Sequence, residues 1–342
     1  MTAHCKPKIG CQVPALSHYH TFHLPAQCQA IESFHDIETA LLLSQACDRF
    51  YLLGEGSNTI FIEDFNGTVL RNRITGIAAS ETSQSIKLRV GAGENWHQFV
   101  TYALEHGYHG MENLALIPGS VGASPIQNIG AYGVEVAHFI ESVEYIELRT
   151  GASKTLPAQD CRFGYRDSIF KHELAGKVLI THVNFSIPKA YTPVTSYGEL
   201  AALTHPTPQH IYDEVIRVRQ QKLPDPHVLG NAGSFFKNPV VSQATFDAIA
   251  ARYSQVPGYP NDENGVKIPA AWLIDQLGFK GQQLGGVRCH PTQPLVLTNT
   301  GMATGQQVIS LAKNIINAVS QEFGVVLEPE VRLVGREGLI SL

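Results

Sequence analysis

The sequence has little that points to secretion, a membrane or nucleic acid. Its 342 residues contain no basic block, and the N-terminus carries charge without the apolar stretch of a signal peptide. No hydrophobic run approaches the length that spans a membrane. With 25 Lys and Arg against 30 Asp and Glu, the net charge is −5, which disfavours a nucleic-acid partner. We therefore expect a soluble cytoplasmic protein that acts as a monomer, without a membrane, nucleic-acid or protein partner.

The sequence also lacks the spacing of a metal site or a disulfide framework. Its six cysteines, at positions 5, 11, 28, 47, 161 and 289, form no Cys-x-x-Cys pair. The fifteen histidines show no His-Glu-x-x-His spacing. No metal is predicted, and we interpret most of the cysteines as small reduced hydrophobic residues.

Residues 110–133 are too rich in glycine for a helix and too apolar for a solvent loop. Their glycines can take positive φ and bring backbone N–H groups close to a ligand, while Pro118 and Pro125 stiffen the turns. Polar side chains add donors and acceptors suited to a flavin edge or a phosphate, at Ser120, Ser124, Gln127 and Asn128. The structural alternative is a tight connection between sheets.

A second glycine-rich loop, Gly-Glu-Gly-Ser-Asn at 54–58, separates two short apolar runs. Its successive N–H groups, with Ser57 and Asn58, could form a nest around a pyrophosphate, and a hairpin turn is the alternative. A dinucleotide fingerprint at residues 91–96 fails, because Trp96 stands where glycine or alanine is needed for close helix packing.

At this length the chain exceeds one compact core, so two or three domains are expected, and residues about 68–187 are interpreted as a strand-rich α+β domain. Residues 1–17 are interpreted as a poorly ordered lead-in. Helices are predicted near 36–47, 96–106, 209–221, 269–278 and 304–323. Strands are predicted at 50–53, 59–62, 68–70, 85–90, 142–148, 177–187, 295–297 and 325–334.

Three further residues can be interpreted chemically. The guanidinium of Arg166 could stabilise developing negative charge, and the alternative is an ion pair in an exposed loop. Ser234 lies on a glycine turn without the pattern of a nucleophile elbow, which leaves a proton-transfer role open. Glu330, on the expected final strand, is either an ion-paired core residue or a placed catalytic acid.

Five sequence words occur together in one order along the chain. They are Gly-Glu-Gly-Ser-Asn at 54–58, Asn-Leu-Ala-Leu-Ile-Pro-Gly with Pro-Ile-Gln-Asn-Ile-Gly-Ala-Tyr-Gly within 113–133, Phe-Gly-Tyr-Arg-Asp-Ser at 163–168, Gly-Ser-Phe-Phe-Lys-Asn-Pro at 233–239, and Leu-Glu-Pro-Glu-Val-Arg at 327–332. From about residue 20 onward the chain resembles the UDP-N-acetylenolpyruvoylglucosamine reductases of bacterial cell-wall synthesis. The connector that carries Tyr197 is similar to the family's first structural type, which has a tyrosine-bearing loop.

The resemblance implies an FAD-binding fold of the vanillyl-alcohol oxidase kind, built from two α+β subdomains, with a C-terminal substrate-binding domain. The implied segments are 1–67 and 68–188 for FAD, 189–222 for the connector, and 223–342 for the substrate, with the final strand returning to the active site. NADPH would give hydride to FAD and leave, and the enolpyruvyl nucleotide would then take that hydride at its vinyl carbon.

Site residues follow from the same resemblance, position by position. Ser234 matches the proton donor, while Arg166 and Glu330 match the pair that stabilises the enolate-like intermediate. Tyr197 and Lys222 would hold the substrate diphosphate, with Tyr165, Asn238 and Gln293 around the sugar and the enolpyruvyl group. The implied FAD contacts are Gly54, Glu55, Gly56, Ser57, Asn58, Pro118, Gly119, Ser120, Gly122, Ala123, Ser124, Gln127, Asn128, Ile129 and Gly130.

One segment departs from the family pattern. Where the family commonly has Asn-Thr-Phe-Gly, this chain has His20, Thr21, Phe22 and His23, which puts a cofactor contact from that segment in doubt. The alternatives are a flavin oxidase that shares only the FAD fold, and a non-catalytic UDP-sugar-binding protein that has lost its flavin. Ser234, Lys222 and Glu330 would have no reason to recur in an oxidase, and the intact glycine loops with all three catalytic candidates disfavour the non-catalytic protein.

Overall fold

The computed structural model describes residues 13–261 and 265–342, which form two compact units. The first unit consists mainly of Gln29–Glu55 and Gly67–Gln221, and the second of Ala15–Cys28, Gly56–Asn66 and Lys222–Leu342. Each unit is therefore assembled from segments that are far apart in the sequence. The finer division into four segments inferred from the sequence stays a prediction.

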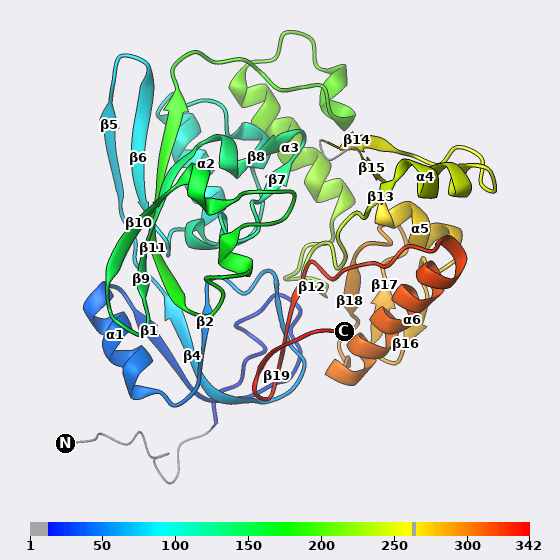
Figure 1. The fold of residues 1–342 in the computed structure, drawn as a ribbon, viewed down its shortest axis with the longest axis horizontal. Helices are drawn as coiled ribbons and strands as arrows, with labels where there is room; N and C mark the ends of the chain where they lie inside the picture. Colours follow the sequence, from blue (N-terminus) through cyan, green and yellow to red (C-terminus); the bar gives the residue numbers. More distant parts are fainter. Residues whose placement is uncertain (1–12, 262–264) are drawn as a thin grey trace. The chain divides into compact units, whose positions relative to one another are not determined.

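The first unit is built around two sheets and a short two-stranded ladder (Figure 1). One sheet has the order β1 (Cys28–Phe34), β4 (Phe65–Asn72), β2 (Phe50–Leu53). The larger has the order β10 (Ser153–Pro157), β9 (Ile140–Glu147), β11 (Val178–Pro188), β6 (Ser85–Gly91), β5 (Ile77–Glu81). The ladder pairs β7 (Gly130–Ala131) with β8 (Val134–Glu135), and the helices are α1 (Ile37–Ala46), α2 (Trp96–Glu105) and α3 (Pro208–Lys222).

The core of the first unit joins α2 to the five-stranded sheet. Trp96 and Phe99 of α2 are 1% exposed, and the Phe99 ring centroid lies 4.9 Å from that of Phe185 on β11. The indole N–H of Trp96 donates to the Leu114 carbonyl at 2.9 Å, which satisfies its one polar atom inside the core. The tryptophan that breaks the dinucleotide fingerprint is thus a core residue, and it fixes the segment after α2 against the sheet.

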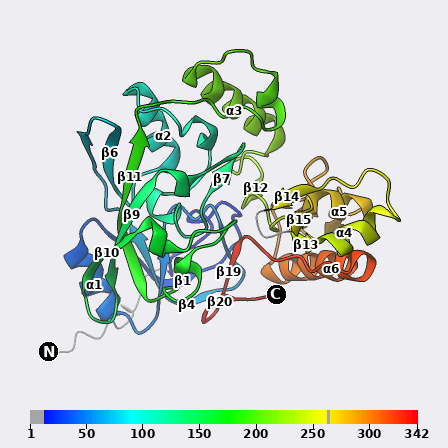
Figure 2. The ribbon, with the colours of Figure 1, turned by 45° about the horizontal axis from the view of Figure 1, so that its top comes forward.

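The second unit contains three small sheets and three helices. The first sheet has the order β12 (Gly230–Asn231), β18 (Leu297–Asn299), β17 (Val287–Cys289), β16 (Gln283–Leu284). The second has the order β13 (Val240–Ser242), β15 (Gly265–Lys267), β14 (Tyr259–Asn261). The third has the order β20 (Gly338–Ile340), β19 (Arg332–Gly335), β3 (Thr59–Phe61). Figures 1 and 2 both show α4 (Gln243–Ala250), α5 (Ala270–Gln276) and α6 (Gly305–Phe323) lying together.

Helix α6 confirms the predicted helix over 304–323. The Thr304 hydroxyl oxygen caps the helix by accepting from the Gln307 backbone N–H. The Gln307 side-chain oxygen in turn accepts from the Thr304 backbone N–H, which completes a capping box. Gly324 ends the helix at φ 65° in the left-handed region that glycine tolerates. One stripe of the helix is buried in the core of the unit, comprising Val308, Leu311, Ala312, Ile315, Val319 and Phe323.

Several sequence predictions were wrong. Most of the expected lead-in lies outside the described residues, but Leu16 is fully buried and its N–H donates to the Ala26 carbonyl, so 15–17 are an ordered part of the second unit. Strand β1 was missed, and the strand predicted at 295–297 runs over Leu297–Asn299. Of the predicted strand at 325–334, only β19 is regular, and the residues before it are held by single bonds to neighbouring segments, such as the Phe236–Pro329 bridge.

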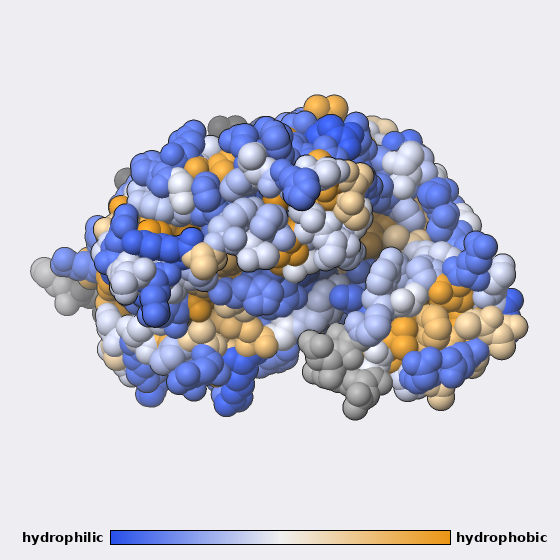
Figure 3. All heavy atoms as spheres, turned by 90° about the horizontal axis from the view of Figure 1, so that it is seen from above, coloured by the Kyte–Doolittle hydropathy of each residue, from blue (hydrophilic) through white to orange (hydrophobic). Residues whose placement is uncertain are grey.

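The surface seen in Figure 3 is covered largely by hydrophilic residues, with hydrophobic ones in small groups. Such scattered apolar exposure is ordinary for a folded protein. Among the described residues, no helix combines the length and apolar character needed to cross a bilayer. Cys28, Cys161 and Cys289 have buried free thiols, as expected of small hydrophobic residues.

Candidate functional site

The loop at 54–58 is a crossing between units, and the hairpin alternative is wrong. The strands on its two sides do not pair with each other: β2 runs parallel to β4, and β3 runs parallel to β19. The division falls inside the loop, so Gly54 and Glu55 belong to the first unit and Gly56, Ser57 and Asn58 to the second.

In the first unit, the loop meets the central glycine-rich stretch at Gly54. A β-carbon at Gly54 would lie 2.6 Å from the Ser120 hydroxyl oxygen, a separation that only glycine permits. Glu55 pairs with Arg73 at 2.8 Å, which holds the carboxylate within this unit. The two segments that the sequence singled out for the same cofactor are therefore in direct contact.

Backbone hydrogen bonds hold the stretch from 118 onward against residues 92–96, where β6 leads into α2. The Trp96 N–H donates to the Gly119 carbonyl at 2.9 Å, the Val121 N–H to Glu94 at 2.9 Å, and the Gly122 N–H to Ala92 at 2.9 Å. A β-carbon at Gly122 would lie 2.5 Å from that of Ala92. These contacts fix the backbone of the stretch. Among its predicted cofactor residues, Pro118 and Ala123 are exposed and Gln127 is half-buried, whereas the buried ones are Ser120, Ser124, Asn128 and Ile129.

Asn128 and Arg166 meet at the end of this stretch. Asn128 is 1% exposed, and its amide donates to the Glu135 carboxylate at 2.7 Å and to the Gly164 carbonyl at 3.0 Å. Arg166 donates to the Gly130 carbonyl at 2.7 Å, and its guanidinium carbon lies 5.2 Å from the centre of the Tyr165 ring. Asp167 pairs with His172 at 2.8 Å. Arg166 is half-buried, and backbone carbonyls accept its hydrogen bonds.

A second guanidinium lies near the first. Arg219 of α3 donates to the Leu116 carbonyl at 3.2 Å, and removal from water lowers its pKa, with Arg166 lowering it further and Tyr132 opposing. Burial also raises the pKa of the Tyr132 hydroxyl. Two cations in one partly desolvated region together attract an anion strongly. Arg219 was not singled out by the sequence motifs, and its half-buried place beside Arg166 is what distinguishes it.

In the second unit, Ser234 and Glu330 lie on segments bonded to each other. The Glu330 N–H donates to the carbonyl of Phe235, the residue after Ser234, at 2.8 Å. The Asn58 amide donates to the Glu330 carbonyl at 3.1 Å, and the Arg332 N–H donates to the Asn58 carbonyl at 2.9 Å. The backbone of Glu330 is therefore fixed from both sides, and Ser234, Glu330 and the loop residue Asn58 are brought together.

The remaining predicted residues lie on several different segments of the chain. Tyr165 stacks beside Arg166, whereas Tyr197 is 52% exposed on the segment before α3, and Lys222 is exposed at the end of that helix. The Asn238 side chain accepts the Ala270 N–H at 2.9 Å at the start of α5. Gln293 is half-buried in the turn before β18.

The segment that departs from the family pattern is structurally accounted for. His23 adopts a left-handed conformation, φ 57°, where the family pattern has glycine. Its two ring nitrogens lie 2.7 Å from the Ser17 carbonyl oxygen and 3.1 Å from that of Pro226. His20 is 2% exposed and packs edge-on against Phe61 at a centroid distance of 5.6 Å. Both histidines thus act as packing residues within the second unit.

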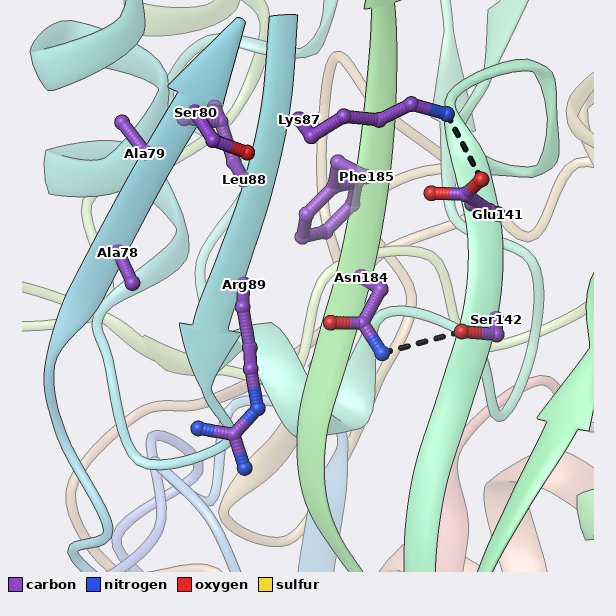
Figure 4. Close-up of a pocket in the computed structure, with 10 residues that line it drawn as sticks. All are labelled: Ala78, Ala79, Ser80, Lys87, Leu88, Arg89, Glu141, Ser142, Asn184 and Phe185. Carbon is purple, nitrogen blue, oxygen red and sulfur yellow. Dashed lines mark hydrogen bonds and ion pairs between the residues drawn. The ribbon is translucent and has the colours of Figure 1, made fainter.

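A hollow of about 280 Å³ lies on the five-stranded sheet and contains none of the predicted site residues (Figure 4). Its polar side chains bind one another: Lys87 pairs with Glu141 at 2.7 Å, and the Asn184 amide donates to the Ser142 hydroxyl at 3.0 Å. These groups satisfy each other on the polar face of an antiparallel sheet.

The chain is similar to proteins of one kind along nearly its whole length. The family profile of the FAD binding domain matches residues 32–156, and that of the UDP-N-acetylenolpyruvoylglucosamine reductase C-terminal domain matches residues 225–334. The UDP-N-acetylenolpyruvoylglucosamine reductase of Pseudoalteromonas atlantica is 54% identical over 331 residues, which cover 96% of each chain. That of Escherichia coli K12 is 51% identical over 292 residues, 85% of each chain.

The likeness extends to a solved structure. The UDP-N-acetylenolpyruvylglucosamine reductase from Thermus caldophilus superposes with a TM-score of 0.64 at 23% identity, covering 94% of this chain and 98% of that one. An α+β fold with an FAD-binding part and a distinct C-terminal domain, as expected from the sequence, is thereby confirmed.

Proposed function

Because the chain belongs to the UDP-N-acetylenolpyruvoylglucosamine reductase family, we propose that it reduces UDP-N-acetylglucosamine enolpyruvate to UDP-N-acetylmuramate with hydride from NADPH. It is an FAD-dependent oxidoreductase of peptidoglycan precursor synthesis. The NADPH donor and the enol-ether acceptor are the proposed part. Both substrates are intracellular nucleotides, which supports a cytoplasmic enzyme, and the chain would act as a monomer.

The residues present fit FAD. Gly54 has no side chain at the point where a β-carbon would lie 2.6 Å from the Ser120 hydroxyl, so the bare backbone of the 54–58 loop begins beside a side-chain donor. Such bare backbone suits the pyrophosphate and ring edge of a flavin nucleotide. When bound, FAD relays hydride from NADPH to the vinyl carbon of the substrate. Because the Asn128 amide is engaged by Glu135 and Gly164, we assign its contact with FAD to the backbone.

Ser234 is the proposed proton donor to the carbon next to the carboxylate. Hydride addition to the vinyl carbon leaves negative charge that must be drawn into the carboxylate, and Arg166 and Glu330 are proposed to stabilise it. The carbonyl contacts of Arg166, such as that to Gly130 at 2.7 Å, keep its guanidinium oriented before substrate arrives. A serine is a weak general acid, but the group that it protonates is a stronger base than the ionised hydroxyl.

Tyr197 and Lys222 are proposed to bind the substrate diphosphate, and Tyr165, Asn238 and Gln293 to surround the sugar and the enolpyruvyl group. We add Arg219 to the residues that attract the substrate's anionic groups. Its support is the half-buried position of its guanidinium, which donates to the Leu116 carbonyl at 3.2 Å and lies near Arg166; the cost of desolvating two cations is offset when an anion binds.

The observation that carries the proposal is the bonding between the Ser234 and Glu330 segments. The bond from the Glu330 N–H to the Phe235 carbonyl at 2.8 Å fixes the backbones of the proposed proton donor and the proposed acid to each other. A non-catalytic sugar-binding protein has no need of this arrangement, whereas proton delivery to a short-lived carbanion does.

An anaerobic spectrum of the purified yellow protein tests the reaction. We expect NADPH to bleach the flavin band and UDP-N-acetylglucosamine enolpyruvate to restore it. If the band returns only when air is admitted, the protein is an oxidase, and the roles of Ser234, Arg166 and Glu330 are wrong.

A substitution of the proton donor separates the two half-reactions. Ser234→Ala should leave bleaching by NADPH within about twofold of the wild-type rate and lower turnover by at least about a hundredfold, because a positioned acid contributes roughly that factor. Stopped-flow absorbance measures both steps. An unchanged rate of reoxidation by the enolpyruvyl nucleotide would contradict the assignment.

A further inference from the structure

The segment that carries Tyr197 is tied to the glycine-rich stretch by one buried side chain. Asn113, on the 3-10 turn Glu112–Leu114, is 2% exposed. Its amide nitrogen lies 2.9 Å from the Tyr132 carbonyl oxygen and 2.8 Å from that of Val194. One NH₂ group thus uses both of its hydrogens to join segments that are 19 and 81 residues away in the sequence.

The two carbonyls belong to segments that present a pair of tyrosine rings. Val194 lies three residues before Tyr197, and the Tyr197 ring stands edge-on to that of Tyr132, with centroids 6.3 Å apart and planes at 84°. At Gly133, which has φ 83°, a β-carbon would lie 3.4 Å from Val194 and 3.8 Å from the β-carbon of Tyr197. The segment therefore packs directly on the backbone next to Tyr132.

A second contact holds the start of the same segment independently. Tyr191 packs edge-on against His109, with centroids 5.5 Å apart, above the buried carboxyl of Glu112. The Tyr191 hydroxyl has no hydrogen-bond partner among the described residues. This contact is one of packing, whereas Asn113 supplies a polar bond near the Tyr197 end.

We infer that Asn113 is a positioning residue for substrate binding, which sets the place of Tyr197 by bonding Val194 and Tyr132 at once. The inference rests on the proposed role of Tyr197 at the substrate diphosphate. Tyr197 is half-exposed, and a mobile ring would lose conformational entropy on binding; the fixed segment lowers that cost. Asn113 itself touches no substrate in this assignment.

The chemistry of position 113 can be changed without changing its shape. Asn113→Asp replaces the donating NH₂ by an acceptor that faces two carbonyl oxygens, so both bonds are lost and repulsion takes their place. In the FAD-loaded enzyme, we expect the KM for UDP-N-acetylglucosamine enolpyruvate to rise about tenfold or more while kcat stays within about twofold. Tyr191→Phe, on the same segment, removes an unpaired hydroxyl and should leave KM unchanged.

A double-mutant cycle with Tyr197→Ala separates positioning from general damage. If Asn113 acts through Tyr197, Asn113→Asp should raise KM much less in the Tyr197→Ala background than in the wild type. Full additivity, or a KM unchanged by Asn113→Asp alone, overturns the inference while leaving the role of Tyr197 intact. A KM unchanged by Tyr197→Ala overturns the proposed substrate contact and the inference with it.

A second variant keeps the test usable if Asn113→Asp does not fold. Gly133→Ala makes only an ordinary contact with Val194 but strains the positive φ of the residue after Tyr132, so it disturbs the Tyr132 carbonyl that Asn113 bonds while leaving the Asn113 side chain unchanged. We expect a rise in KM of similar size that is likewise reduced by Tyr197→Ala. An unchanged KM for folded, yellow Gly133→Ala protein would contradict the inference.

Discussion

His20 brings a titratable ring into the core of the second unit at a cost that depends on pH. Its Nε2 lies 3.4 Å from the Leu24 carbonyl oxygen, and its Nδ1 has no hydrogen-bond partner among the described residues. Burial, with a smaller effect of neighbouring His23, lowers its pKa to about 4. The folded protein therefore keeps His20 neutral where an unfolded chain would protonate it.

This pKa shift predicts a loss of stability in mild acid. Below about pH 6.5 the unfolded chain binds a proton that the folded chain refuses until about pH 4. The free energy of unfolding should fall across that window by about 3 kcal/mol from this residue alone. His20→Asn restores the family pattern at this position. Between pH 7.5 and 4.5, its free energy of unfolding, followed by thermal unfolding, should fall less than that of the wild type, by roughly 3 kcal/mol.

The matched control is His35→Asn, because His35 is exposed. It should leave the dependence of Tm on pH as in the wild type. Parallel Tm curves for His20→Asn and the wild type would contradict the prediction, since the missing titration would then have no effect on folding.

At the scale of the element, α6 shows what a complete set of local signals specifies. Its apolar stripe, the capping box of Thr304 and Gln307, and Gly324 at the C-terminus predict one helix between fixed ends. Gly305, the first helical residue, has a second reason to be glycine, because a β-carbon there would lie 1.8 Å from the Ile62 carbonyl oxygen. The start of the helix is thus set by its own cap and by contact with the end of β3.

The cap has a measurable contribution. Thr304→Ala removes the acceptor for the Gln307 N–H and should lower the free energy of unfolding by about 1 kcal/mol. Chemical denaturation measures the change at constant m-value. Asn314→Ala, on the exposed face of the same helix, should change stability by less than about 0.5 kcal/mol. Equal effects of the two substitutions would mean that the cap adds nothing.

Elements with strong periodicity could be predicted from the sequence, and those defined by distant partners could not. Helices α1, α2, α3, α5 and α6 lie within a few residues of their predicted ranges, because their apolar spacing and terminal residues are local signals. Strand β1 was missed since Ile31 and Phe34 fit the spacing of the following helix. The short strands β13 and β14 each pair with β15, and no local sequence pattern predicts such pairing.

The candidate site shows the same limit. Motifs identified the loops and named Arg166, Ser234 and Glu330, since each lies in a distinctive word of the sequence. The burial of Asn113 and the partial burial of Arg219 depend on contacts with residues far along the chain, at Val194 and Leu116. Their sequence neighbourhoods, an ordinary turn and an ordinary basic helix end, contain no signal of that burial.

At the scale of the whole molecule, the second unit cannot be obtained as one continuous piece. Its core includes Phe22 and Leu24 from one early segment and Ile60 and Ile62 from another, packed with residues of 222–342. Without these side chains the remaining segment would expose the apolar surface that they cover.

A fragment experiment measures this dependence. Residues 222–342 expressed alone should lack the dispersed amide spectrum of a folded domain and should bind a hydrophobic dye, because two core-forming segments are missing. A chain in which 15–28 and 56–66 are joined to 222–342 through flexible linkers should regain dispersion. Cooperative unfolding of the short fragment would contradict the prediction.

The parallel pairing of β3 with β19 also sets an order of events at the ribosome. Thr59, Ile60 and Phe61 pair with Arg332, Leu333 and Val334, so β3 is synthesised long before its partner strand. Until then the nascent chain carries an unpaired apolar strand edge, which is the kind of surface that chaperones cover. The second unit therefore completes its folding only once β19 has emerged, whereas the first unit needs no residue beyond α3.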